Sequence, residues 1–343
     1  MGEILGLGTT DYPRMRTADP NMPGPFRDNL GGIHVKPAAT NPANWPEAMQ
    51  KEWSDDEALV TGQIARERQG GFYSKLNDEL DAFNPDFVLI WSKDQRESLK
   101  NFSVPQFWVQ AYDTVDIKPG LTFFKDQDLD RVVTLKGHKE GALHLVKGLQ
   151  KEGFDPTYAL EPLHPQGLAH TFRGVTTHLS WNNLDYKYPI VPVSIDPFGL
   201  RERGPDGLEP NFDTAVMPMS TKRAFELGRA TARVLKASPY RVALVAGVGW
   251  SHANNTSWER SWVNPDVAAD QKLHDEEWAT GKFTEWANRF TYEEMEEHAW
   301  WELVCWVALA GAMTELGAKL KWTDFETHYV FNSNWCNCAF TTA

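Results

Sequence analysis

The stretch RVALVAGVGWSH, Arg241–His252, decides the fold class of this chain. Its first part, Arg241–Val248, is apolar after the opening arginine, and its valines favour a strand that is buried on both faces of a sheet. The run then passes through Gly249 into the polar residues Ser251 and His252. Polar side chains directly after a buried strand are typical of α/β proteins, whose sites lie where the strands end in loops.

Other strand-like runs alternate with helical patterns along the chain. This alternation predicts an α/β protein in which residues 1–343 form a single layered domain, with a central mixed β-sheet flanked by helices. Two irregular segments interrupt it: a surface excursion at about 20–56, and a Trp-rich segment at about 254–290 that is a possible lid. We expect strands at Ile4–Gly8, Phe87–Trp91, Phe107–Ala111 and Tyr188–Ile195, the last near a sheet edge because prolines interrupt it, and helices at Glu57–Phe83, Gly137–Gly153, Lys222–Lys236 and Thr291–Gly317.

Charge and composition indicate which binding partners and which cellular compartment to expect. Lys and Arg number 34 against 47 Asp and Glu, giving a formal charge of -13, and no basic run occurs, so we expect neither nucleic-acid nor membrane binding. No apolar run approaches the ~20 residues of a membrane span. Met1 is followed by Ile4 and Leu5 without the basic start of a secretory signal, and the three cysteines are too few for a disulfide framework. A cytoplasmic location is therefore expected.

Aromatic residues are unusually frequent, with 15 Trp, 18 Phe and 9 Tyr. Their large apolar faces can build a core, a subunit contact or a pocket for a flat ligand. Most of them are expected in the core. We predict a homodimer, although a single globular domain could bury the same residues alone.

Glu302 is the most informative polar residue, because it stands among Trp301, Leu303 and other apolar residues of the last predicted helix. A buried carboxylate costs several kcal/mol unless it is paired, protonated or bound to a metal. A salt bridge or a solvent-facing position is the alternative to a functional role. His298 lies four residues earlier, on the same helical face, where the two side chains could share a divalent metal. His164 and His170 form a second possible ligand pair.

Motifs for the commonest nucleotide-dependent enzymes and serine hydrolases are missing: the sequence contains no P-loop, no Gly-x-Gly-x-x-Gly and no Gly-x-Ser-x-Gly. The polar residues instead gather at expected strand ends. These strand-end segments are Thr9–Pro13, Ser92–Gln95, His164–His170 and Ser251–His252.

Taken in order, five motifs resemble the class III extradiol ring-cleavage dioxygenases, the superfamily of the protocatechuate 4,5-dioxygenase β subunit. The resemblance covers most of the chain and implies that superfamily's α/β fold. The family's opening Ser/Thr-Ser-His-x-Pro turn corresponds to Thr9-Thr10-Asp11-Tyr12-Pro13, and its Pro-Asp-Val-Val strand running into Asn-Asp-His corresponds to Pro85-Asp86-Phe87-Val88 running into Lys93-Asp94-Gln95. Its Asp-His-Gly segment corresponds to Pro165-Gln166-Gly167, and its Gly-Gly-x-Ser-His motif to Val248-Gly249-Trp250-Ser251-His252. Its late helix corresponds to Glu302-Leu303-Val304-Cys305-Trp306 with Gly311-Ala312.

The resemblance also implies roles for particular residues. In the family, two histidines and the helix glutamate hold Fe(II), the Ser-His histidine is the acid/base, and the Asp-His-Gly histidine contacts substrate or oxygen. The corresponding positions here hold Asp11, Gln95 and Glu302 for the metal, His252 for the acid/base and Gln166 for the substrate. An all-oxygen set suits Mg²⁺, Ca²⁺ or Mn²⁺ better than Fe(II). We therefore expect no bound metal. If a metal is bound, its expected ligands are Asp11, Gln95 and Glu302.

The favoured hypothesis is an enzyme of aromatic compound catabolism: a metal-independent lyase that cleaves a C–C bond of a small phenolic, lignin-like compound. A retro-aldol or deformylation step would release a small aldehyde, with His252 as general base and Asp11 and Glu302 as its catalytic partners. The expected substrate-binding residues are Tyr12, Gln95, Gln166, His170, Trp250 and Trp301. Two alternatives remain: an Fe(II)-dependent extradiol dioxygenase acting on a catechol, and a catalytically inactive partner subunit.

Overall fold

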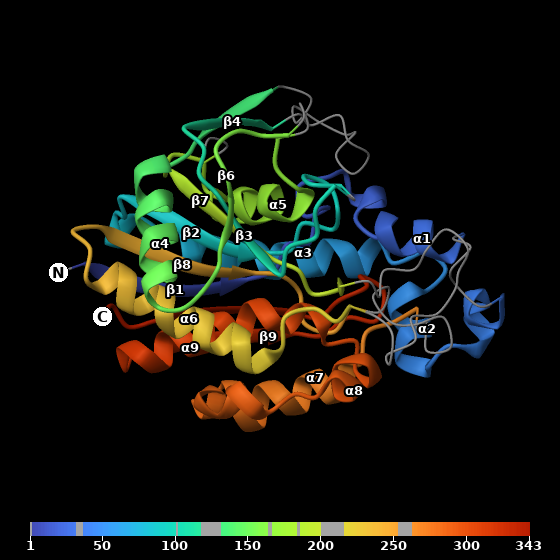
Figure 1. The fold of residues 1–343 in the computed structure, drawn as a ribbon. Coiled ribbons are helices and arrows are strands. Elements are labelled where there is room, and N and C mark those ends of the chain that lie inside the picture. The colour runs from blue at the N-terminus through green and yellow to red at the C-terminus, as the bar shows by residue number, and fades with distance from the viewer. Residues whose placement is uncertain are drawn as a thin grey trace.

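The computed structural model describes residues 2–31, 37–100, 102–117, 132–163, 167–183, 186–199, 216–252 and 263–343. Its centre is an eight-stranded sheet with the strand order β6-β3-β7-β2-β8-β1-β10-β9, and β4 and β5 pair separately (Figure 1). The strands are β1 (Glu3–Thr9), β2 (Phe87–Ser92), β3 (Phe107–Gln110), β4 (Thr114–Ile117), β5 (Val133–Lys136), β6 (Thr157–Ala159), β7 (Ile190–Ile195), β8 (Arg241–Gly247), β9 (Leu320–Glu326) and β10 (Trp335–Phe340).

The sheet is mixed, as the sequence predicts. Strands β7, β2, β8 and β1 run parallel to one another, whereas β3 is antiparallel to β7, and β10 is antiparallel to both β1 and β9. Because β1, β2 and β8 are parallel neighbours, their carboxyl ends at Thr9, Ser92 and Gly247 lie at one edge of the sheet. The polar residues that follow these three strands are thereby brought together.

Helices cover both faces of the sheet (Figure 1). Helices α4, α6 and α9 pack on one face and α3 and α5 on the other, each with its own hydrophobic core. The α-helices are α1 (Gly24–Leu30), α2 (Glu47–Trp53), α3 (Leu59–Phe83), α4 (Lys139–Lys151), α5 (His170–His178), α6 (Thr221–Lys236), α7 (Val267–Leu273), α8 (Tyr292–Glu297) and α9 (Val304–Leu316). Short turns of other helix types lie at Asp19–Asn21, Pro37–Thr40, Pro42–Asn44, His274–Trp278, Lys282–Asn288 and Trp301–Leu303.

The predicted helix from Thr291 to Gly317 is broken in the structure. The spacing of Thr291 and Glu294 predicts a capping box, and the two residues form one at the start of α8. The helix nevertheless ends at Glu297, and Ala299 has a left-handed φ of 56°. Glu302 therefore lies on the 3₁₀ turn Trp301–Leu303, ahead of α9. The expected shared helical face of His298 and Glu302 is wrong, because His298 Nδ1 instead lies 2.9 Å from Oδ2 of Asp266.

Two details of the strand and helix predictions are also wrong. Strand β7 lies inside the sheet, between β3 and β2, rather than near an edge. Its pairing with β3 covers Val193–Ile195 and stops before Pro192, so the proline is not part of that ladder. The helical spacing of the apolar residues in Glu57–Phe83 also predicts Ile64, Leu76 and Leu80 as inward positions. In α3, Leu76 and Leu80 face the core, whereas Ile64 is 61% exposed.

The two irregular segments are more ordered than the sequence indicates. The excursion at about 20–56 contains α1 and α2, whose Phe26 and Met49 are completely buried. Of the possible lid, residues 254–262 lie outside the described part of the chain. Its remainder places Trp278 and Trp286 in the core. No helix within the described ranges is long and apolar enough to cross a membrane.

Candidate functional site

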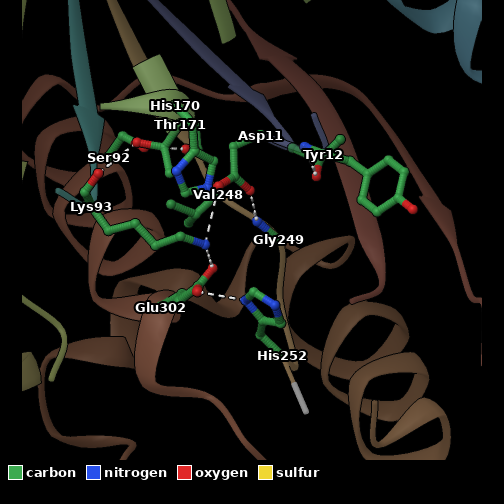
Figure 2. A network of polar contacts seen from close by, with 12 residues as sticks. Asp11, Tyr12, Ser92, Lys93, His170, Thr171, Val248, Gly249, His252 and Glu302 are labelled. Carbon is green, nitrogen blue, oxygen red and sulfur yellow. Dashed lines mark hydrogen bonds and ion pairs between the residues drawn. The ribbon is translucent and has the colours of Figure 1, made fainter. Parts of the chain in front are cut away.

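Four charged or titratable side chains form one continuous chain of contacts at the edge where β1, β2 and β8 end (Figure 2). Nζ of Lys93 lies 3.0 Å from Oδ2 of Asp11 and also forms an ion pair with Oε2 of Glu302. The other oxygen of Glu302, Oε1, lies 2.7 Å from Nδ1 of His252. The order of contacts is therefore Asp11, Lys93, Glu302, His252.

The backbone around these residues is fixed by hydrogen bonds between the strand ends. Oδ1 of Asp11 accepts a hydrogen bond from the backbone N–H of Gly249 at 3.1 Å. The Ser92 hydroxyl, at the end of β2, donates to the carbonyl of Gly247 at 2.7 Å, and the Thr171 hydroxyl donates to the carbonyl of Lys93 at 2.5 Å. The segments after β1, β2 and β8 and the start of α5 thus hold one another in place.

Helix α5 reaches this edge because it carries a glycine at the point of contact. A Cβ atom on Gly174 would lie only 2.5 Å from the backbone oxygen of Asp11. Any larger residue would push α5 away from the end of β1. His170 and Thr171 at the start of α5 therefore depend on Gly174 for their position beside Asp11 and Lys93.

The central ion cluster is buried and charged. The side chain of Lys93 is 1% exposed and that of Glu302 is fully buried. Burial alone would lower the pKa of Lys93, but the carboxylates of Asp11 and Glu302 outweigh it and raise that pKa above its usual value. Burial alone would raise the pKa of Glu302, yet Lys93 and His252 hold it well below its usual range. Lys93 is thus an ammonium, and Glu302 a carboxylate, at neutral pH.

His252 lies at the solvent-facing end of this chain, with 19% of its side chain exposed. Its backbone N–H donates to the carbonyl of Ala299 at 3.0 Å. Since Nδ1 faces the ionised Glu302, the neutral ring carries its proton on Nδ1 and presents the lone pair of Nε2. Nε2 lies on the edge of the ring that is turned away from Glu302 (Figure 2), and it has no hydrogen-bond partner among the described residues. A carboxylate-oriented imidazole with an available nitrogen is the arrangement of a general base.

A second histidine–carboxylate pair lies at the start of α5. The backbone N–H of His170 donates to Oε2 of Glu97 at 3.1 Å, and Nδ1 of its ring contacts Oε1 of the same carboxylate. Burial alone would raise the pKa of Glu97, but His170, together with the more distant Arg173, lowers it. The adjacent Thr171 binds the backbone of Lys93, so His170 is positioned next to the ion cluster (Figure 2).

The other residues that the sequence singles out lie elsewhere or belong to the core. Gln95 is half-buried, forms no hydrogen bond with Asp11, Lys93 or Glu302, and lines a separate small pocket with Arg96 and Trp108. Gln166 and His164 lie outside the described residues.

The three aromatic candidates are buried rather than displayed at a surface. The Tyr12 hydroxyl donates to the carbonyl of Met22 at 2.6 Å, and its ring packs against Phe331 and Trp335. Trp250 and Trp301 are completely buried. Trp250 packs in a cluster of aromatic rings that includes Trp278, Trp286, Trp306 and Phe325. These positions give the three rings a packing role beneath the site.

The Fe(II) ligand set implied by the resemblance does not fit these residues. The Lys93 ammonium, which has no lone pair to offer a metal, lies between Asp11 and Glu302, and Gln95 does not join them. The described part of the chain holds no group of three or more His, Cys, Asp and Glu residues arranged to hold a metal ion. The same lysine therefore supplies the positive charge between the carboxylates.

Lys93 and Glu97 are the site residues that sequence reasoning missed. Lys93 follows directly after the fully apolar segment Phe87–Trp91 and Ser92, and an ammonium at such a place needs a buried carboxylate partner. That signal could have paired it with Glu302. Glu97 carries no comparable signal, because its partner His170 lies 73 residues away in the sequence.

Comparisons with known proteins give no match: no protein-family model matches the sequence, and no curated protein is significantly similar to it. The α/β class, with a large mixed sheet flanked by helices, is established by the structure itself. Membership of the extradiol dioxygenase superfamily stays a prediction.

Proposed function

We propose that this protein is a metal-independent carbon–carbon lyase acting on a small phenolic compound, on a diverged extradiol dioxygenase scaffold. The observation that carries the proposal is the buried chain in which the Lys93 ammonium bridges Asp11 and Glu302 and Glu302 orients His252. This arrangement keeps a general base and its orienting carboxylate while a fixed ammonium occupies the position between the carboxylates.

In the proposed reaction, Nε2 of His252 removes the proton of a hydroxymethyl group on the side chain of the phenolic substrate. The C–O bond becomes a carbonyl, the adjacent C–C bond breaks, and its electron pair passes to the carbon that is conjugated with the ring. His252 returns the proton to that carbon, so the products are formaldehyde and the shortened aromatic compound. Atoms and electrons balance, and neither oxidant nor reductant is consumed.

The other three residues in the chain of contacts orient His252 or hold its surroundings in place. Glu302 accepts the Nδ1–H hydrogen bond and stabilises the imidazolium that forms when Nε2 takes the proton. Lys93 is too deeply buried to meet the substrate, and it keeps Glu302 ionised. Asp11 holds both Lys93 and the backbone of Gly249, and so links the strand ends beside the base.

Substrate binding is assigned to residues around His252. His170, which is held by Glu97 and has 11% of its side chain exposed, and Gln166 are proposed to bind substrate oxygens. Tyr12, Trp250 and Trp301 would act by shaping the packing under the site, and Gln95 only if the substrate extends to the neighbouring pocket. A homodimer in the cytoplasm remains the proposed setting.

The experiment is a screen of hydroxymethyl-bearing phenolic compounds for aldehyde release, without oxygen and with a metal chelator present. His252→Gln removes the base. His144→Gln is the matched control, because His144 is a half-buried histidine of α4 whose ring contacts Tyr240, ahead of β8. We expect release by the wild type and by the control, and a loss of about 10²–10⁴-fold in the His252 variant. Full turnover of the same substrate by His252→Gln would overturn the proposal.

A further inference from the structure

The carboxylate of Asp270, on α7, is completely buried beside the site and is not used by the proposed reaction. Both of its oxygens accept hydrogen bonds. Oδ2 accepts from the backbone N–H of Ser251 at 2.9 Å and from Nδ2 of Asn334 at 2.7 Å. Oδ1 accepts from the indole N–H of Trp300.

The three donors belong to the segments that hold the proposed catalytic pair. Ser251 immediately precedes His252, and Trp300 lies two residues before Glu302. Asn334 leads into β10, and its carbonyl accepts the backbone N–H of Trp250 at 3.0 Å. One carboxylate therefore ties the loop after β8 to the turn that carries Glu302 and to the sheet.

Asp270 offers these three donors two acceptor oxygens. An asparagine at this position would have a single acceptor oxygen and would turn an NH₂ group toward an N–H donor. Burial raises the pKa of Asp270 to about 7, whereas the hydrogen bonds from Asn334, Trp300 and Ser251 act in the opposite direction. No lysine or arginine forms an ion pair with it in the described part of the chain. An apolar residue would avoid the cost of burying this charge.

We infer that Asp270 is a positioning residue of the site: by holding Ser251 and Trp300 on one carboxylate, it sets the contact between His252 and Glu302. The catalytic importance of Asp270 rests on the proposed function, because that function makes His252 the general base. The geometric role does not depend on it. Removing the carboxylate should loosen the segments on both sides of the histidine ring.

The test is nuclear magnetic resonance of the full-length protein with ¹⁵N-labelled histidine rings, comparing the wild type with Asp270→Asn. The His252 signals are assigned by their loss in His252→Gln. We expect the wild-type ring to carry its proton on Nδ1, and the Asp270 variant to shift the ¹⁵N signals of the His252 ring, because the contact between Nδ1 and Glu302 is loosened. With a substrate in hand, kcat should fall about 10–100-fold, with KM nearly unchanged.

Asp324→Asn is the matched control, because Asp324 is a partly buried carboxylate on β9 that is bound by Arg68 at 3.2 Å. It should leave the His252 signals unchanged. If Asp270→Asn does not fold, Trp300→Phe removes one donor and keeps an aromatic ring, and a smaller shift of the same signals is expected.

Two results separate this inference from the proposed function. A folded Asp270→Asn, or a folded Trp300→Phe in its place, with His252 signals identical to the wild type overturns the positioning role. Unchanged turnover in His252→Gln overturns the proposed function, while a shifted His252 signal in Asp270→Asn still supports the positioning role.

Discussion

Oε1 of Glu302 lies 2.7 Å from Nδ1 of His252, while Oε2 of the same carboxylate contacts the buried Lys93 ammonium. One carboxylate thus connects the partly exposed imidazole of His252 with a cation in the interior. Because Asp11 binds the other side of Lys93, the positive charge is shared by two carboxylates. The predictions below test what each member of this chain contributes.

Replacing Lys93 by methionine should destabilise the protein strongly. The substitution keeps a long side chain but leaves Asp11 and Glu302 buried without their cation, so we expect a loss of about 3–5 kcal/mol in the free energy of unfolding. Urea denaturation measures it. Lys321→Met, which removes an exposed ion pair with Glu79, is the control and should cost about 0–1 kcal/mol. Equal losses of stability in the two variants would contradict the stabilising role of the buried ion cluster.

Replacing Glu302 by glutamine should lower kcat by about 10²–10⁴-fold with little change in KM. Glutamine nearly preserves the shape of the side chain but carries no charge to stabilise the imidazolium of His252. Steady-state kinetics on a substrate from the aldehyde screen measures both constants. An unchanged kcat would show that Glu302 does not assist the base. Glu315→Gln, at the end of α9 away from the site, is a suitable control.

Stability should depend on pH in two opposite ways. Asp270 has a folded-state pKa of about 7, above its unfolded value, so between about pH 4 and 7 the folded state keeps a proton that the unfolded state has lost. Its contribution makes stability fall as pH rises through this range. The pKa of Glu302 is depressed, so its contribution is present above its unfolded pKa and is lost as pH falls through its folded pKa.

Denaturant midpoints measured from acidic to neutral pH check this pattern in the wild type and in Asp270→Asn. The wild type should lose stability between about pH 4 and 7, and the variant, which has no carboxyl at position 270, should show a flatter profile over that range. Parallel profiles for the two proteins would mean that Asp270 does not titrate there.

Much of the fold could be predicted from sequence, because apolar runs such as Arg241–Val248 and Phe87–Trp91 correspond to strands buried on both faces of the sheet. The broken helix could not, since the capping box at Thr291 and the apolar residues up to Gly317 fit one continuous helical pattern. The break depends on the left-handed backbone at Ala299. Tertiary contacts there outweigh local propensity.

The site was predictable in part for a similar reason. Asp11 and His252 are predictable because strand-end motifs carry them, and Glu302 because it stands among apolar residues of a predicted helix. The structure brings all three together. Lys93 is not predicted, because the resemblance assigns the ligand position to Gln95, two residues further on. Which side chain after β2 turns inward depends on the backbone beyond the strand, where Gln95 has a left-handed φ of 47°.

The Lys93 ammonium also predicts the response to metal. Purified protein incubated anaerobically with Fe(II) and then desalted should retain far less than one iron per chain, because the position between Asp11 and Glu302 already holds a cation. Mass spectrometry of the metal content checks this. Iron retained at about one per chain would show that another ligand set exists.

The most direct test of the account is aldehyde release from a hydroxymethyl-bearing phenolic compound in the absence of oxygen and in the presence of a chelator. We predict formaldehyde and a shortened aromatic product in equal amounts, formed by the wild type and lost in His252→Gln. Turnover that appears only when Fe(II) and oxygen are both supplied, with oxygen consumed and the ring opened, would contradict it.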